Sequence, residues 1–175
     1  MHAKKWLIDK DHSDVQFKIK HMVISTVTGA FNNFQGGATT ENNMEHAEVH
    51  FSLDVNSIDT NQEERDAHLR SADFFDAAQF PTITFESHDF RKIKGNRYVL
   101  TGNLTMKGIT KPVELVAEYG GTAPDMNGKT KIGFEVTGRI SRWEFGLTYN
   151  AVMEAGGLIL GEDVMVEANI QLVQI

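Results

Sequence analysis

Strict alternation of apolar and polar side chains is the feature that most constrains how this chain of 175 residues can fold. In residues 47–55, Val49, Phe51, Leu53 and Val55 alternate with polar residues, which is the period of a strand with one face in a core. Similar strand-like runs occupy residues 15–20, 27–34, 82–93, 97–106, 113–119, 132–140 and 163–175. The pattern therefore predicts about eight strands, and the first run extends upstream toward Trp6 and Ile8.

Short turns separate most of these runs. Lys94-Gly95-Asn96 and Asn127-Gly128 are typical of hairpin turns, and Gly36 and Gly37 also indicate a turn. Short connections make neighbouring strands antiparallel, and a closed barrel leaves no strand edge exposed. We therefore predict an all-β chain, a single domain over residues 1–175, folded as one eight-stranded antiparallel barrel with a short helical insertion.

The helical insertion is expected within residues 60–86. Thr60 and Glu63 match a capping box, in which a hydroxyl and a carboxylate satisfy backbone N–H groups at a helix start. The spacing predicts a helix over about residues 61–71. Pro81 should end any second helical turn, because the residue before a proline is disfavoured in helical conformation.

Composition excludes several classes of function. Seventeen basic and 24 acidic residues give a net charge of −7, which disfavours nucleic acid as a partner. The chain has no cysteine, so disulfides, thiolate metal sites and cysteine nucleophiles are excluded. No apolar run reaches the ~20 residues of a membrane-spanning helix. The start of the sequence does not match a secretory signal, so we expect a cytoplasmic protein, or a periplasmic one if a signal was removed.

No catalytic or metal-binding motif accompanies the strands. The sequence lacks both the HExxH and the GxSxG patterns, so we expect neither metal ligands nor a catalytic nucleophile. The apolar strand faces carry many phenylalanines and methionines. An eight-stranded barrel can be filled by such side chains or can leave room for a slender ligand, and periodicity alone leaves both possibilities open.

Short motifs along nearly the whole chain resemble one known family. They are Asp11-His12-Ser13, Thr28-Gly29, Arg65-Asp66-Ala67-His68-Leu69, Asp73-Phe74-Phe75, Phe80-Pro81, Gly102-Asn103-Leu104-Thr105-Met106-Lys107-Gly108, and Ser141-Arg142 with Phe145-Gly146. In order and spacing they are similar to those of the YceI-like family, also called polyisoprenoid-binding proteins.

This resemblance implies a lipocalin-like barrel whose elongated apolar pore holds a long-chain amphipathic lipid. The expected role is to bind, sequester or transport an isoprenoid quinone or polyprenyl compound, with no cofactor beyond that ligand and a homodimer as one possibility. Members are often periplasmic. The residues expected to line the lipid site are Phe17, Ile19, His21, Phe31, Phe34, Phe51, Arg65, His68, Phe74, Phe75, Phe85, Leu104, Met106, Phe134, Trp143 and Phe145.

The role of the charged residues near the helix and the function of the chain both stay open at this point, the latter with three readings. Arg65 and Asp66 form structural ion pairs that dock the helix, or else Arg65 or His68 meets a lipid headgroup at the mouth of the pore. The chain is a lipid carrier, or it is an enzyme that acts on such a lipid with His21, His68 or Asp66 as acid or base. A stress-related structural protein with a filled core is the third reading, and it predicts no cavity.

Overall fold

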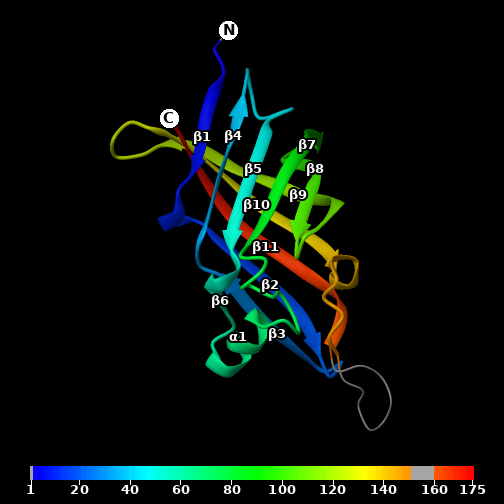
Figure 1. The fold of residues 1–175 in the computed structure, drawn as a ribbon. Coiled ribbons are helices and arrows are strands. Elements are labelled where there is room, and N and C mark those ends of the chain that lie inside the picture. The colour runs from blue at the N-terminus through cyan, green and yellow to red at the C-terminus, as the bar shows by residue number, and fades with distance from the viewer. Residues whose placement is uncertain (1, 151–159) are drawn as a thin grey trace.

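An antiparallel barrel forms the centre of the computed structural model, which describes residues 2–150 and 160–175 (Figure 1). Within these residues, eight strands are hydrogen-bonded in a closed ring, because the first strand of the chain pairs with the last. In ring order they are β1 (Lys4–Ile8), β4 (Phe34–Thr40), β5 (Glu48–Asp54), β7 (Thr82–Lys94), β8 (Arg97–Met106), β9 (Ile109–Pro124), β10 (Thr130–Ser141) and β11 (Leu160–Gln174). The predicted all-β, eight-stranded antiparallel barrel is confirmed.

A further set of strands, β2 (Asp14–His21), β3 (Ser25–Phe31) and β6 (Ile58–Asp59), extends one end of the barrel. The long β11 pairs with β1 near its C-terminus and with β2 near its N-terminus, where Leu160 is opposite His21. A 3-10 turn, η1 (Lys10–His12), separates β1 from β2. The predicted first strand is therefore two strands that lie end to end along β11.

Gly36 and Gly37 lie inside β4 and do not form the turn that the sequence indicated. A Cβ atom on Gly37 would lie 2.2 Å from the carbonyl oxygen of Trp6, and one on Gly36 would lie 2.5 Å from that of His50. Glycine is thus required at both positions because the neighbouring strands approach closely, and not because the chain turns there. The predicted strand over residues 27–34 correspondingly becomes β3 and the start of β4.

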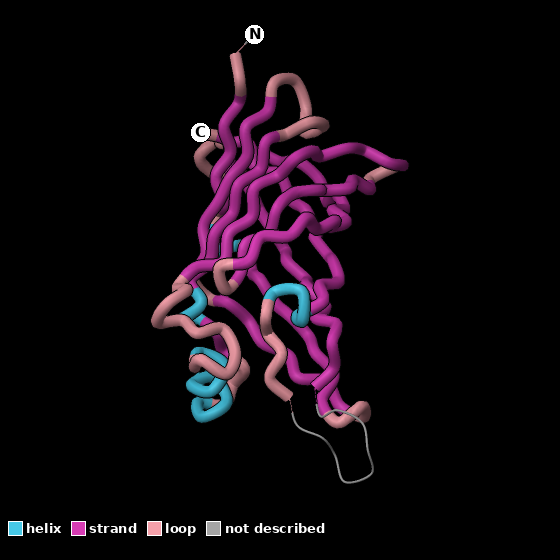
Figure 2. The backbone as a smooth tube through the Cα atoms, turned by 45° about the vertical axis from the view of Figure 1, so that its right-hand side comes forward, coloured by secondary structure: helices cyan, strands magenta, loops and turns pink. Residues whose placement is uncertain are grey.

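The helical insertion is α1 (Glu63–Arg70), which follows β6 and lies at the extended end of the barrel (Figure 2). Gln62 is the N-cap and its side chain makes no capping hydrogen bond, so the predicted capping box is wrong. The hydroxyl of Thr60 bonds to the side chain of Asp66 instead. β7 begins at the residue after Pro81, as expected from the proline. The remaining 3-10 turns are η2 (Val55–Ser57) and η3 (Arg142–Phe145).

The apolar faces of the strands point into the barrel as their alternation predicts. On β11, the five apolar residues at every second position, Val164, Val166, Ala168, Ile170 and Leu172, all line the interior. Over the described parts of the chain, no helix is long and apolar enough to cross a membrane.

Candidate functional site

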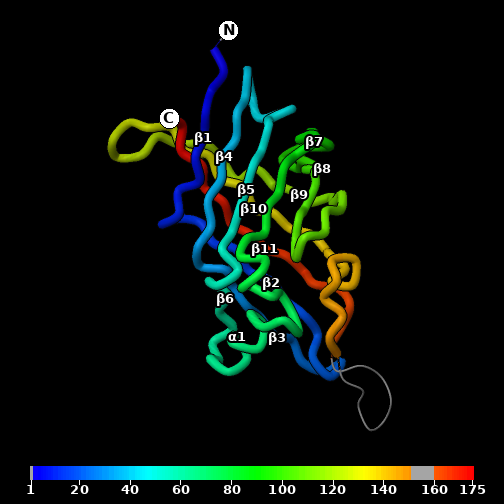
Figure 3. The backbone as a smooth tube through the Cα atoms, in the orientation of Figure 1, coloured from blue at the N-terminus to red at the C-terminus, as the bar shows by residue number. Residues whose placement is uncertain are grey.

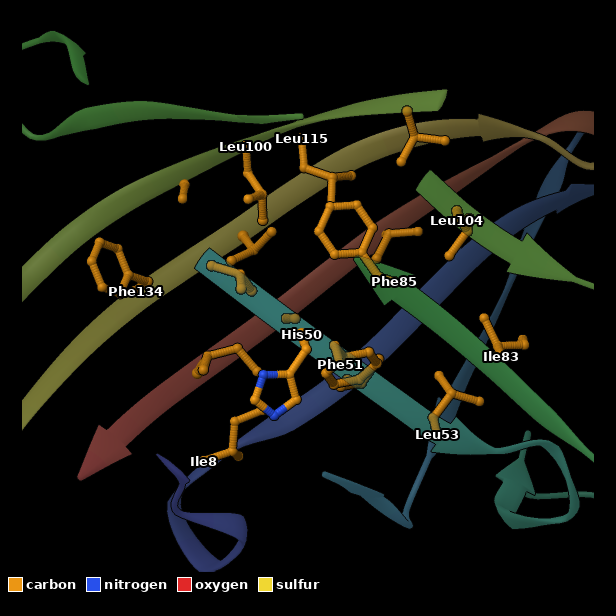
Figure 4. A pocket seen from close by; sticks show the side chains of 18 of the residues that line it. Ile8, His50, Phe51, Leu53, Ile83, Phe85, Leu100, Leu104, Leu115 and Phe134 are labelled. Carbon is orange, nitrogen blue, oxygen red and sulfur yellow. The ribbon is translucent and has the colours of Figure 1, made fainter. Parts of the chain in front are cut away.

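An apolar cavity of about 200 Å³ occupies the middle of the barrel. Phe51 on β5 and Phe85 on β7 are opposite each other in the strand register, and both rings line this cavity (Figure 4). Nearly all of the other lining residues are also aliphatic or aromatic. A cavity needs only about 10–15 Å³ to hold one water molecule, so this space is large enough for many. Because its lining is apolar, however, water is not well held there. We call this space the inner cavity.

Aromatic rings close the end of the inner cavity that lies away from α1. Phe90 and Tyr98 stack with ring centroids 4.7 Å apart, and Phe134 meets Phe90 edge-on at 5.5 Å. Tyr119 lies 5.8 Å from Phe134. Burial raises the pKa of the Tyr98 hydroxyl. The inner cavity therefore ends at an aromatic wall.

A second cavity of about 300 Å³, the outer cavity, lies between the α1 segment and the strands β2, β3 and β11. The two cavities lie side by side and share lining residues on six different strands. The shared residues are Phe17, Phe31, Ile83, Met106, Ile140 and Val166. The interior therefore contains open space, which favours a hollow barrel over a solid core, and we call the two cavities together the passage.

The segment that follows α1 covers the outer cavity with aromatic side chains. Phe75 meets Phe31 edge-on with centroids 5.9 Å apart. Phe74, His68 and Tyr149 form a triangle in which each pair of ring centroids is 5.0 Å apart. His68 is held by Asp73, whose carboxylate oxygen lies 2.8 Å from Nε2. These rings form one wall of the outer cavity.

Thr60 fixes the position of α1 through a buried hydrogen-bond network. Its backbone N–H and its hydroxyl donate to the same carboxylate oxygen of Asp66, at 2.8 and 2.5 Å. Arg65 donates from Nε to the Thr60 hydroxyl at 2.7 Å and from Nη2 to the Thr60 carbonyl at 2.6 Å. Within the described residues, Arg65 and Asp66 make no direct ion pair and are connected through Thr60. Both residues thus dock the helix, and Arg65 also lines the outer cavity.

Arg142, at the start of η3, is only 3% exposed and lines the outer cavity. Its Nε donates to the carbonyl of Gly161 at 2.7 Å, and Nη1 donates to the carbonyls of Leu147 and Tyr149 at 2.5 and 3.0 Å. Its Nη2 has no hydrogen-bond partner among the described residues. Burial lowers the pKa of this guanidinium. An unpaired donor on a buried cation is costly, so this position favours a nearby acceptor oxygen.

The polar side chains around the outer cavity share one chemical property. His21, Arg65, His68, Arg142 and Tyr149 all carry hydrogen-bond donors, and no carboxylate lines this cavity among the described residues. The inner cavity has no comparable group of donors. The passage thus has an apolar end and a donor-rich end, which is the polarity of an amphipathic molecule.

The structure brings most of the predicted lipid-site residues to these two cavities. The residues that line one or both are Phe17, Ile19, His21, Phe31, Phe51, Arg65, His68, Phe74, Phe75, Phe85, Leu104, Met106 and Phe134. Three predicted residues lie elsewhere. Phe34 is buried against Phe51 outside the lining, Phe145 is fully buried in η3, and Trp143 is 43% exposed at the surface.

Sequence reasoning missed ten residues that line the outer cavity. They are Val27, Leu69, Ile83, Ile140, Arg142, Leu147, Tyr149, Leu160, Val164 and Val166. Arg142 belongs to a motif that matched the family, and that match was the available signal for its importance. Leu147 and Tyr149 lie in an irregular stretch in which no period indicates a buried face. Across residues 2–150 and 160–175, no group of three or more histidine, aspartate or glutamate side chains could hold a metal ion.

A closed antiparallel barrel with a hollow, mostly apolar interior is the class of protein that this fold and cavity define. The chain belongs to the YceI-like family, because the family model described as a YceI-like domain matches residues 6–172. Protein YceI of Salmonella newport is 42% identical over 149 residues, which cover 83% of this chain and 78% of that protein.

Solved structures agree with this assignment. The Campylobacter jejuni YCEI protein superposes with a TM-score of 0.69 at 36% identity, covering 92% of this chain and 95% of that one. BcnA of Burkholderia cenocepacia has a TM-score of 0.81 at 22% identity, covering 94% and 98%. A polyisoprenoid binding domain from Saccharophagus degradans has a TM-score of 0.69 at 15% identity, covering 96% and 97%. The last two similarities concern the fold.

Proposed function

We propose that this protein binds a long-chain amphipathic lipid inside the barrel and sequesters or transports it. The observation that carries this proposal is the apolar inner cavity, which shares six lining residues with the adjoining outer cavity. Cavities in mutated cores cost about 24 cal/mol per Å³, so an inner cavity of about 200 Å³ left empty would cost about 5 kcal/mol. That cost reaches the lower end of the roughly 5–15 kcal/mol by which folded proteins are stable, and a bound apolar chain removes it.

The polarity of the passage orients the lipid. Its tail occupies the inner cavity and ends near the aromatic wall at Phe134, where each buried CH₂ contributes about 0.8 kcal/mol. Its head lies in the outer cavity, where Arg65, His68 and Arg142 offer donors to an acceptor oxygen. The tail provides most of the affinity, and the head fixes the direction of entry.

An isoprenoid quinone or a polyprenyl compound is the class of ligand that we favour. A branched, unsaturated chain suits a passage lined by rings and β-branched residues along its length. The similarity in fold to a polyisoprenoid binding domain supports this choice. It also fits the family to which the chain belongs.

The position and the hydrogen bonds of the candidate acid Asp66 favour a binding role over an enzymatic one. Asp66 accepts two hydrogen bonds from Thr60 and lines neither cavity, so it is not placed to exchange a proton with a ligand. His68 lines the outer cavity but is bonded to Asp73, at a partly exposed position. These contacts stabilise the wall of the outer cavity, which His21, the third candidate, also lines.

Mass spectrometry of an organic extract from gently purified protein tests the proposal. We expect the wild type to carry a long-chain lipid in near-stoichiometric amount. Val136→Trp places a large ring in the inner cavity, and the milder Val136→Phe repeats the test if the first variant folds poorly. Both should lose lipid, whereas Glu135→Gln, on the outward face of the same strand, should retain it. A wild-type extract without lipid, or equal lipid in all variants, would refute the proposal.

A further inference from the structure

The turn between β2 and β3 exposes three large apolar side chains in succession. Met22 is 44% exposed, Val23 is 69% exposed and Ile24 is 86% exposed. The other exposed large apolar residues in the described parts of the chain are isolated from one another in the sequence. Single exposed apolar residues are normal on a protein surface, whereas a cluster indicates an interaction site.

The backbone of this turn is also unfavourable for the residues that it carries. Met22 and Val23 have φ values of 54° and 65°. Positive φ is uncommon for residues other than glycine, and it is a real outlier for a β-branched side chain such as valine. Asparagine or glycine would fit this backbone better. Strained conformations of this kind are concentrated at functional sites, so the apolar residues have a role other than forming the turn.

The turn lies beside the mouth of the outer cavity. His21 and Val27, on the two strands that lead into the turn, both line that cavity. His21 is opposite Leu160, which exchanges two hydrogen bonds with the side chain of Asn150. Tyr149, the preceding residue, also lines the cavity and is 42% exposed. Figure 3 shows the turn between β2 and β3 at the same end of the molecule as α1.

Charges near the turn are mixed in sign. Lys20 precedes it on β2, and the neighbouring bulge of β11 carries Glu162 and Asp163. Glu162 accepts a hydrogen bond from Ser141, and Asp163 lies 3.8 Å from Arg139. Among the described residues around the turn, the positive charges of Lys20 and Arg139 therefore balance the negative charges of Glu162 and Asp163. Contact through this turn should depend on apolar burial and only weakly on salt.

We propose that residues 22–24 insert into the surface of a lipid bilayer and hold the mouth of the outer cavity against it. Apolar side chains at the tip of a soluble domain gain free energy by entering the boundary between headgroups and acyl chains. In this position a lipid passes between the bilayer and the cavity without crossing open water. The choice of a bilayer as partner rests on the proposed lipid-binding function.

Binding to vesicles tests the inference directly. The probe is a phosphatidylcholine vesicle without anionic lipid, and the readout is co-sedimentation of the purified full chain. The variant Met22→Asn/Val23→Gly/Ile24→Thr removes the apolar groups and supplies residues that accept positive φ. We expect its partition coefficient to fall at least about tenfold, because several buried CH₂ groups are lost. Its melting temperature should not fall, since the turn is relieved of strain.

Met126→Ser is the matched control, because Met126 is fully exposed in the β9–β10 turn at the opposite end of the molecule (Figure 1). It should bind vesicles as the wild type does. The lipid content of each protein, measured separately, distinguishes failure of this inference from failure of the lipid-binding function. A wild type that does not sediment with vesicles overturns the inference, as does equal binding by the triple variant. A triple variant that changes only the oligomeric state assigns the turn to a contact between copies and also overturns it.

Discussion

Replacing Thr60 by valine should destabilise the chain by removing one hydroxyl from a buried network. The side chain is 4% exposed, and its hydroxyl donates to Asp66 at 2.5 Å and accepts from Arg65 at 2.7 Å. Valine has nearly the same shape, so packing is preserved while both bonds are lost. A hydrogen bond to a charged group contributes about 1.5–3 kcal/mol, and two bonds that share one atom are less than additive. We expect the free energy of unfolding to fall by about 2–4 kcal/mol.

Urea denaturation followed by circular dichroism measures this change as a shift of the midpoint at constant slope. Hydrogen exchange should also become faster in α1, because Thr60 connects that helix to the preceding strand. Thr28→Val, at an exposed position on β3, is the control and should change the free energy of unfolding by less than about 0.5 kcal/mol. If Thr60→Val were no more destabilising than this control, the network would not be what fixes α1.

Two further predictions concern the contact between β1 and β4 and the ion pair of Asp9 with Lys131. Gly37→Ala should lower the free energy of unfolding by about 1–3 kcal/mol, because the added Cβ would lie 2.2 Å from the backbone oxygen of Trp6. Gly133→Ala is the control, because its Cβ would meet no atom within 4 Å, and its midpoint in urea should be close to that of the wild type. Asp9 accepts a hydrogen bond from Lys131 at 2.7 Å, which lowers the pKa of the Asp9 carboxyl. Its stabilisation is therefore present above the unfolded-state pKa of about 3.9 and is lost as pH falls through the folded value. Thermal melting of Asp9→Asn should show a deficit at neutral pH that disappears in acid, and a deficit that grew in acid would contradict the assigned pair.

Alternation predicted those parts of the fold in which a single strand has one buried face. The inward residues of β11 and the aromatic pair Phe51 and Phe85 follow directly from the period of two. A helix was predicted over about residues 61–71 and is found as α1, although the capping box that indicated its start does not form. Pro81 marked the return to strand at β7. The position of the lining residues along the passage then follows from the closed ring, since each strand presents one face to the interior.

Contacts between distant segments could not be read in the same way. Gly37 is required by the approach of β1, which lies more than thirty positions earlier in the chain. Thr60 resembled a helix cap locally, but its hydroxyl is used by Asp66, six residues away. Arg142 is buried and donates to three backbone carbonyls, those of Leu147 and Tyr149 in an irregular stretch and that of Gly161 in β11, whereas arginine is usually exposed. In each case tertiary packing decides the role of the residue, and the local pattern does not contain it.

A crystal structure of the protein purified without added ligand tests the central claim most directly. Electron density inside the barrel is the measurement. The account predicts one continuous, elongated feature that begins near Arg142 in the outer cavity and ends near Phe134 in the inner cavity. Cavities that contain no density, or that are closed by inward movement of their own side chains, would contradict it.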